Sequence, residues 1–220
     1  MEAVVRRLMR GVALTLAFGF SVAAEIVDRV AVTVDKIVIT TSDILSHVRV
    51  AAFLNEEPPD LSPAARRAAA QRLVEQALVQ REMEILRYPA PSGADVDAVL
   101  EQLRRRANSP DAFQARLAEY GITEVELRRS LLRQIMTLRF IDFRFRPGVA
   151  VTDAEIEAYY RDEFLPTFLA NGRGAPPPLE EAREEIEEIL IGRRVDEALD
   201  RWLTAAAAQA AIEYREEAFQ

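Results

Sequence analysis

The stretch that decides the fold is residues 26–39, IVDRVAVTVDKIVI, where β-branched residues recur on both sides of a turn signal. Every second residue from Val30 to Val34 is valine, and these three side chains share one face because strand side chains alternate. Asp35-Lys36 is typical of a two-residue hairpin turn, and Ile37–Ile39 begins the returning strand. Because an isolated hairpin is only marginally stable, the pattern also predicts a third strand or a covering helix.

A candidate for that third strand lies at the other end of the chain. Ile212-Glu213-Tyr214 follows the last helical region and alternates in polarity. A lone strand needs a partner for its backbone groups, and the other strand pattern in the sequence is the hairpin. We therefore expect the C-terminal strand to pair with the N-terminal hairpin, within one chain or across a dimer.

Residues from Ser62 to Ala210 carry helical periodicity, interrupted by strong start and stop signals. Ser-Pro pairs and Thr-x-x-Glu capping boxes mark the starts, whereas glycine and proline mark the ends. A short helix upstream is expected to have Ser42 as its N-cap. The predicted fold is mainly α with a small antiparallel β element. The long helices are expected at residues 63–87, 94–107, 110–119, 124–146, 153–169 and 179–210.

Composition excludes several classes of site. The chain of 220 residues is half apolar and contains one His and no Cys, so Cys/His zinc sites, disulfides and Cys nucleophiles cannot be built. The sole imidazole, His47, is expected to be a surface or half-buried residue rather than a catalyst. No cofactor, nucleotide or metal is expected.

Residues 1–24 have the pattern of a secretory signal peptide. Three arginines precede an apolar run of 12 residues, and the small residues Val22-Ala23-Ala24 suit a cleavage site. The run is too short to span a membrane, although an uncleaved N-terminal anchor is the alternative. Without residues 1–24 the chain keeps 25 basic and 35 acidic residues, a net charge of −10. Such a charge opposes binding to nucleic acid, and we expect no stable membrane insertion.

Five motifs follow one another along the chain and together suggest a family. They are residues 38–44 (VITTSDI), 73–80 (LVEQALVQ), 113–117 (FQARL) with Gly121-Ile122-Thr123 and Leu127-Arg128, 151–156 (VTDAEI), and Tyr159-Tyr160. In this order, behind a signal peptide, they resemble the SurA-like family of periplasmic chaperones for outer-membrane proteins. Members of that family usually also carry parvulin-type prolyl isomerase domains.

The resemblance implies a helical chaperone body similar to those of SurA and trigger factor. It implies a signal peptide at 1–24, an N-terminal chaperone domain at 25–169, a linker at 170–178, and a C-terminal helix and strand at 179–220 that complete the same domain. The interval from Tyr160 to Leu179 has no room for a parvulin domain, so the isomerase is expected to be absent. Asp35 stands where the family usually has Asn, and this difference is expected to change little.

Two other patterns have simpler explanations. Residues 113–133 are spaced like a helix-turn-helix, but the signal peptide and the acidic charge favour an ordinary pair of helices over DNA binding. The glutamates between Glu180 and Glu188 suggest a calcium site. They lack the turn geometry of calcium loops and fit a solvated helix start instead.

The helix expected over residues 124–146 is the most informative segment for function. One apolar stripe, Leu127, Leu131, Ile135, Leu138, Ile141 and Phe145, is the ordinary core-facing side. A second stripe lies on the opposite side, bordered by Arg128, Arg139 and Arg146 and by Arg133 and Arg144. Such a helix is either sandwiched inside the fold or lends one side to a partner. The second stripe gives the candidate client-binding residues: Val125, Leu132, Met136, Phe140 and Phe143.

Three functions remain open from the sequence. The first is a periplasmic holdase that binds unfolded or nascent exported polypeptides without isomerase activity. The second is a non-catalytic structural or adaptor subunit that uses the same stripe as a dimer or complex interface, and a homodimer is possible. The third is a divergent prolyl isomerase.

Overall fold

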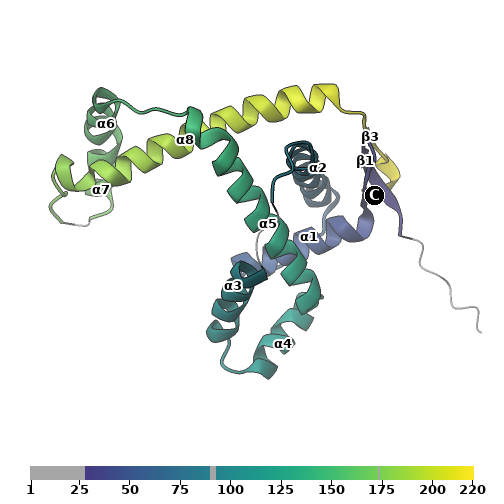
Figure 1. Cartoon of the computed structure of the whole chain (residues 1–220). Helices are drawn as coiled ribbons and strands as arrows, with labels where there is room; N and C mark the ends of the chain where they lie inside the picture. Colours follow the sequence, from purple (N-terminus) through teal and green to yellow (C-terminus); the bar gives the residue numbers. More distant parts are fainter. Residues whose placement is uncertain (1–27, 90–92, 173) are drawn as a thin grey trace, which may run out of the picture.

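The computed structural model describes residues 28–89, 93–172 and 174–220, and it shows a largely helical molecule with one small sheet at one end (Figure 1). The expected mainly α fold with a small antiparallel β element is confirmed. The expected signal peptide at residues 1–24 lies outside the described residues. Within the described part of the chain, no helix is both long enough and apolar enough to cross a membrane.

The sheet has three antiparallel strands in the order β2-β1-β3, so the expected pairing of the hairpin with the C-terminal strand is confirmed. Its strands are β1 (Val30–Val34), β2 (Ile37–Thr40) and β3 (Ile212–Tyr214). Val32 of β1 lies opposite Ile39 on one side and Tyr214 on the other. The pairing occurs within one chain, and it leaves β2 as an edge strand.

Asp35 in the hairpin turn does more than adopt its left-handed conformation, at φ 52°. Its backbone N–H donates to the carbonyl of Ala211, and its carboxylate accepts from the Ala211 N–H at 2.9 Å. The same carboxylate pairs with Arg81 at 2.5 Å. The Ala211 hydrogen bond and the Arg81 guanidinium both lower the pKa of Asp35. The expected left-handed conformation of Asp35 in the turn is therefore confirmed, and the carboxylate in addition joins the turn to a helix and to the start of β3.

The expected helices are present with small shifts in their bounds. The first, α1 (Thr41–Asn55), starts earlier than expected: its N-cap is Thr40, not Ser42, because Thr40 and Asp43 form a capping box. The expected caps at Ser62, Ser109 and Thr123 are confirmed. The remaining helices are α2 (Pro63–Ile85), α3 (Gly93–Arg106), α4 (Pro110–Glu119), α5 (Glu124–Phe145), α6 (Asp153–Tyr159), α7 (Leu165–Ala170) and α8 (Leu179–Gln209).

The helix expected over residues 153–169 is divided by a π-helical segment, η2, at Tyr160–Phe164. Pro166 follows in the first turn of α7 and has no backbone N–H to donate to the carbonyl of Asp162. A wider turn avoids the clash between the proline ring and that carbonyl. The sequence pattern missed this break because the apolar periodicity continues through it.

Four buried clusters hold the elements together. The sheet packs on α2 and the C-terminal part of α8, with Val34, Leu78 and Phe219 among the buried residues. A second cluster joins α1, α3, α4 and α5 around Phe53 and Leu127. A third joins α2 and α5, and a fourth joins α6 to the N-terminal part of α8. Figure 1 shows α8 running from α6 and α7 at one end to the sheet at the other.

Candidate functional site

Helix α5 changes its packing partners along its length, and this explains its two apolar stripes. In its first half, Leu127 and Leu131 are buried in the cluster shared with α1, α3 and α4. In its second half, Phe140 is buried against Val79 and Met83 of α2. The buried side of the helix therefore moves from one stripe to the other. Each stripe consequently leaves some apolar side chains exposed.

The structure places the five candidate client-binding residues in three environments. Val125, Leu132 and Phe143 are 66%, 37% and 59% exposed. Met136 is half-buried, whereas Phe140 is only 1% exposed and belongs to the core. At 100° per residue, the four residues other than Phe140 lie within about 40° of one another around the helix. We call these four, Val125, Leu132, Met136 and Phe143, the α5 stripe.

Aromatic contacts explain why Phe140 and Phe143 differ. The ring of Tyr88, just after α2, lies edge-on to Phe140 with centroids 5.2 Å apart. The same ring is tilted against Phe143, also at 5.2 Å. Tyr88 thus covers Phe140 and supports Phe143 from one side only. On the opposite stripe, Leu138 is 59% exposed rather than core-facing, because the buried side has already moved away from it.

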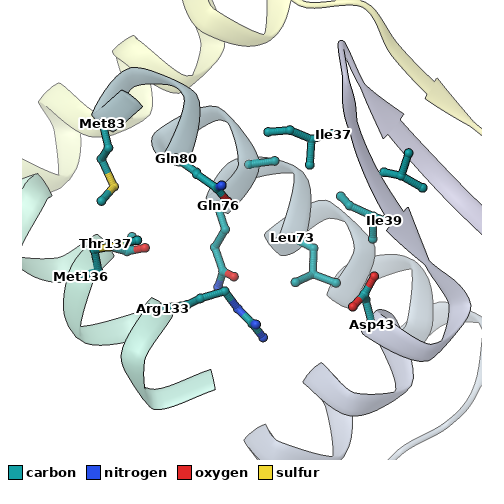
Figure 2. Close-up of a pocket in the computed structure, with 12 residues that line it drawn as sticks. Ile37, Ile39, Asp43, Leu73, Gln76, Gln80, Met83, Arg133, Met136 and Thr137 are labelled. Atoms are coloured by element: carbon teal, nitrogen blue, oxygen red, sulfur yellow. The ribbon is translucent and has the colours of Figure 1, made fainter. Parts of the chain in front are cut away.

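A groove lies between the edge of the sheet and α5, with α2 as its floor (Figure 2). Its volume is about 180 Å³. Figure 2 shows Ile37 and Ile39 on the sheet side and Met136 with Thr137 on the α5 side, while Gln76 extends from α2 between them. We call this cavity the β2 groove. Its lining residues are Ile37, Val38, Ile39, Asp43, Leu73, Gln76, Ala77, Gln80, Met83, Arg133, Met136 and Thr137.

Arg133 is the one arginine in the lining of the β2 groove, and its guanidinium is half-buried. Burial lowers the pKa of Arg133, an effect that attraction to Asp43 opposes and repulsion by Arg129 reinforces. Among the described residues, no carboxylate lies within ion-pair distance of this guanidinium. The groove thus combines apolar side chains of the sheet and α2 with a guanidinium, Arg133, and a carboxylate, Asp43, that are not ion-paired to each other.

The other arginines that border the second apolar stripe are engaged within the fold. Arg139 makes a two-point pair with Asp95 at 2.7 and 2.8 Å. Arg128 pairs with Asp97, Arg146 with Glu188, and Arg144 lies 3.9 Å from Glu82. Arg133 differs from them because it lines a cavity and makes no ion pair within the described residues.

His47 lines a second cavity of about 340 Å³ between α1, α2 and α5. Burial, and then the charges of Arg72 and Arg133, lower the pKa of His47, which favours the neutral ring. Ser130 lines the same cavity, but no hydrogen bond joins it to His47 in the part of the chain described. Gln76 lines both cavities, so the two adjoin at this residue. The imidazole lines this second cavity, and among the described residues no nucleophile is hydrogen-bonded to it.

No set of three or more His, Asp or Glu side chains is arranged to hold a metal ion in residues 28–89, 93–172 and 174–220. Of the glutamates that open α8, Glu188 pairs with Arg146 at 2.5 Å.

Sequence reasoning missed most of the β2 groove. Leu73, Gln76, Ala77 and Gln80 follow the i, i+3, i+4, i+7 spacing of one helix face, so the floor could have been identified as a unit. The two walls, β2 and α5, could not have been identified, because the distance between them depends on how α5 crosses α2. Met136 is the one candidate residue that the structure places in this groove.

Comparison with known proteins gives two related chains. A protein named Chaperone SurA from Chromobacterium violaceum is 29% identical over 137 residues, which are 60% of this chain and 31% of that protein. A protein named Chaperone SurA from Bordetella avium is 26% identical over 161 residues, 72% of this chain and 32% of that protein. No protein-family model matches the chain. The expected resemblance to the SurA-like family is confirmed, and the chain spans about a third of the length of the curated relatives it matches.

Proposed function

We propose that this SurA-like chain is a holdase-type chaperone that binds unfolded outer-membrane or secreted polypeptides. The observation that carries the proposal is the α5 stripe, whose Val125, Leu132 and Phe143 are exposed while Met136 leads into the β2 groove. Two relatives that are named chaperones support a role of this kind.

The stripe and groove have the properties that binding to many unfolded chains requires. Exposed apolar side chains on a stable helix offer area without a fixed shape, and Met136 adapts to varied partners. Phe143 supplies an aromatic surface that is already held in place by Tyr88. The interaction needs no cofactor, because it uses burial of apolar surface alone.

The place of action and the organisation of the chain are part of the same proposal. Residues 1–24 direct export to the periplasm and are then removed. Residues 25–169 form the chaperone domain, 170–178 a linker, and 179–220 the helix and strand that complete it. The pairing of β3 with β1 supports the proposal that residues 179–220 complete this domain, because the two strands lie at opposite ends of the sequence.

The proposal predicts that the protein suppresses aggregation of an unfolded chain. A β-barrel outer-membrane protein, unfolded in urea and diluted into buffer, is a suitable client. We expect light scattering to fall as the protein is added, because exposed apolar segments of the client are covered. An acidic helical protein of similar size controls for crowding. Unchanged scattering at a severalfold excess of the chain would contradict the proposal.

We also propose that the chain has no prolyl isomerase activity. The residues between Tyr160 and Leu179 are occupied by η2, α7 and a short connection, and His47 lies far away on α1. We therefore expect no acceleration of cis/trans exchange in a proline-containing tetrapeptide. Since the uncatalysed reaction takes tens of seconds, weak catalysis is measurable. Catalysis that scales with protein concentration and survives repurification would favour the divergent isomerase instead.

A further inference from the structure

The edge of β2 has backbone groups available to another strand. Asp35 and Lys36 form the two-residue turn, so Val34 and Ile37 are the hydrogen-bonded pair that closes the hairpin. Val38 and Thr33 are then a non-hydrogen-bonded pair, and the N–H and C=O of Val38 point away from β1. Sheet order places no strand of the described chain on that side.

This free edge forms one wall of the β2 groove. Ile37, Val38 and Ile39 line the groove opposite Arg133 and Met136 of α5. Its volume of about 180 Å³ exceeds the roughly 150 Å³ of an apolar cavity that admits benzene, so one side chain can enter. A folded element cannot enter, whereas an extended segment can lie along β2 and insert one side chain.

The positive charge of Arg133 indicates which kind of side chain would bind in the groove. Arg133 is half-buried and has no ion pair within the described chain, so a carboxylate from outside would gain a charge-assisted contact. The nearby Asp43 carboxylate accepts hydrogen bonds from the backbone N–H and hydroxyl of Thr40 at the start of α1. Asp43 lines the same groove and attracts Arg133, but it lies beyond ion-pair distance, so the Arg133 guanidinium keeps room for a direct contact with an incoming carboxylate.

We propose that the β2 groove binds an extended segment of the client as an added strand on β2, with an acidic side chain of that segment on Arg133. The added residue opposite Val38 exchanges two backbone hydrogen bonds with it, and the acidic side chain that enters the groove lies near Arg133 and Met136. This inference rests on the proposed function and names the kind of segment that is bound. Because the edge offers few backbone bonds, binding is weak and reversible, as release of a client requires.

Two peptides that differ only in a carboxylate or an amide at the central side chain test whether Arg133 binds an acidic residue. The probe is a fluorescein-labelled heptapeptide of alternating Val and Thr with a central Glu, and its partner carries Gln there. We expect the full chain to bind the Glu peptide about tenfold more tightly, in line with a charge-assisted bond, as measured by fluorescence anisotropy. Arg133→Gln should remove this preference. Arg129→Gln, one turn away and outside the groove, should keep it. Equal preference in Arg133→Gln and the parent protein would overturn the proposal.

Hydrogen exchange tests the strand addition. The Val38 amide should gain protection on addition of the Glu peptide, and a peptide N-methylated at its central residues should lose both binding and protection. Thermal melts verify that Arg133→Gln is folded. If the chain suppresses client aggregation but shows neither the Glu preference nor Val38 protection, this inference fails while the proposed function stands. If aggregation is not suppressed, the proposed function fails instead.

Discussion

Replacing Phe140 by Ala is expected to destabilise the protein by about 3–5 kcal/mol, the range for removing a buried aromatic ring. Phe140 is 1% exposed and packs against Val79, Met83 and the edge of Tyr88. The truncation would leave a cavity where α5 crosses α2, and this crossing also positions the α5 wall of the β2 groove. Urea denaturation followed by circular dichroism measures the change in the free energy of unfolding.

Phe143→Ala is the matched control, because the same atoms are removed three residues away. Phe143 is 59% exposed and contacts Tyr88 from one side, so its loss should cost about 1 kcal/mol or less. Similar costs for the two variants would mean that Phe140 is not part of the core. A large difference would show that two aromatic residues of one predicted stripe have different roles.

The sequence pattern on α5 was informative but could not assign these roles. Periodicity identifies two apolar sides of a helix, yet it does not tell which neighbour covers which turn. Leu127 and Leu131 are covered by α1, α3 and α4. Phe140 is covered by α2. Because the covering helix changes midway, Leu138 of the core-facing stripe is exposed and Phe140 of the other stripe is buried.

Local signals predicted the remainder of the fold well, for a physical reason. Caps, turn residues and strand alternation act through backbone groups only a few residues apart, as in the capping box of Thr123 and Glu126. The pairing of β3 with β1 was also predictable, because a lone strand must satisfy its backbone groups. The ion pair between Asp35 and Arg81 was not predictable, because it depends on how α2 lies on the sheet.

The β2 groove shows the same limit at the candidate site. The sequence pattern places Arg133 beside an apolar stripe of α5, but it places Arg128 and Arg139 there in the same way. Only the packing of α3 gives those two arginines the partners Asp97 and Asp95, while Arg133 faces the groove. The functional distinction among chemically identical residues therefore arises from tertiary structure.

Changing the exposed part of the α5 stripe should abolish client binding without unfolding the protein. The variant replaces Val125, Leu132 and Phe143 together by Ser. We expect suppression of client aggregation in the light-scattering assay to be lost, because the apolar area offered to the client is removed. The free energy of unfolding should fall by no more than about 2 kcal/mol, since substitutions at exposed positions cost little each and roughly add.

A variant of equal chemistry elsewhere separates binding from general hydrophobicity. Leu138 and Leu169 are each 59% exposed but lie outside the α5 stripe, so Leu138→Ser with Leu169→Ser should retain full suppression of aggregation. Multi-angle light scattering at several protein concentrations distinguishes the adaptor or dimer alternative. If the stripe is an interface between two copies, the parent chain should show a concentration-dependent dimer that the triple variant lacks. A monomeric parent that loses client binding in the triple variant alone places the unfolded chain on α5.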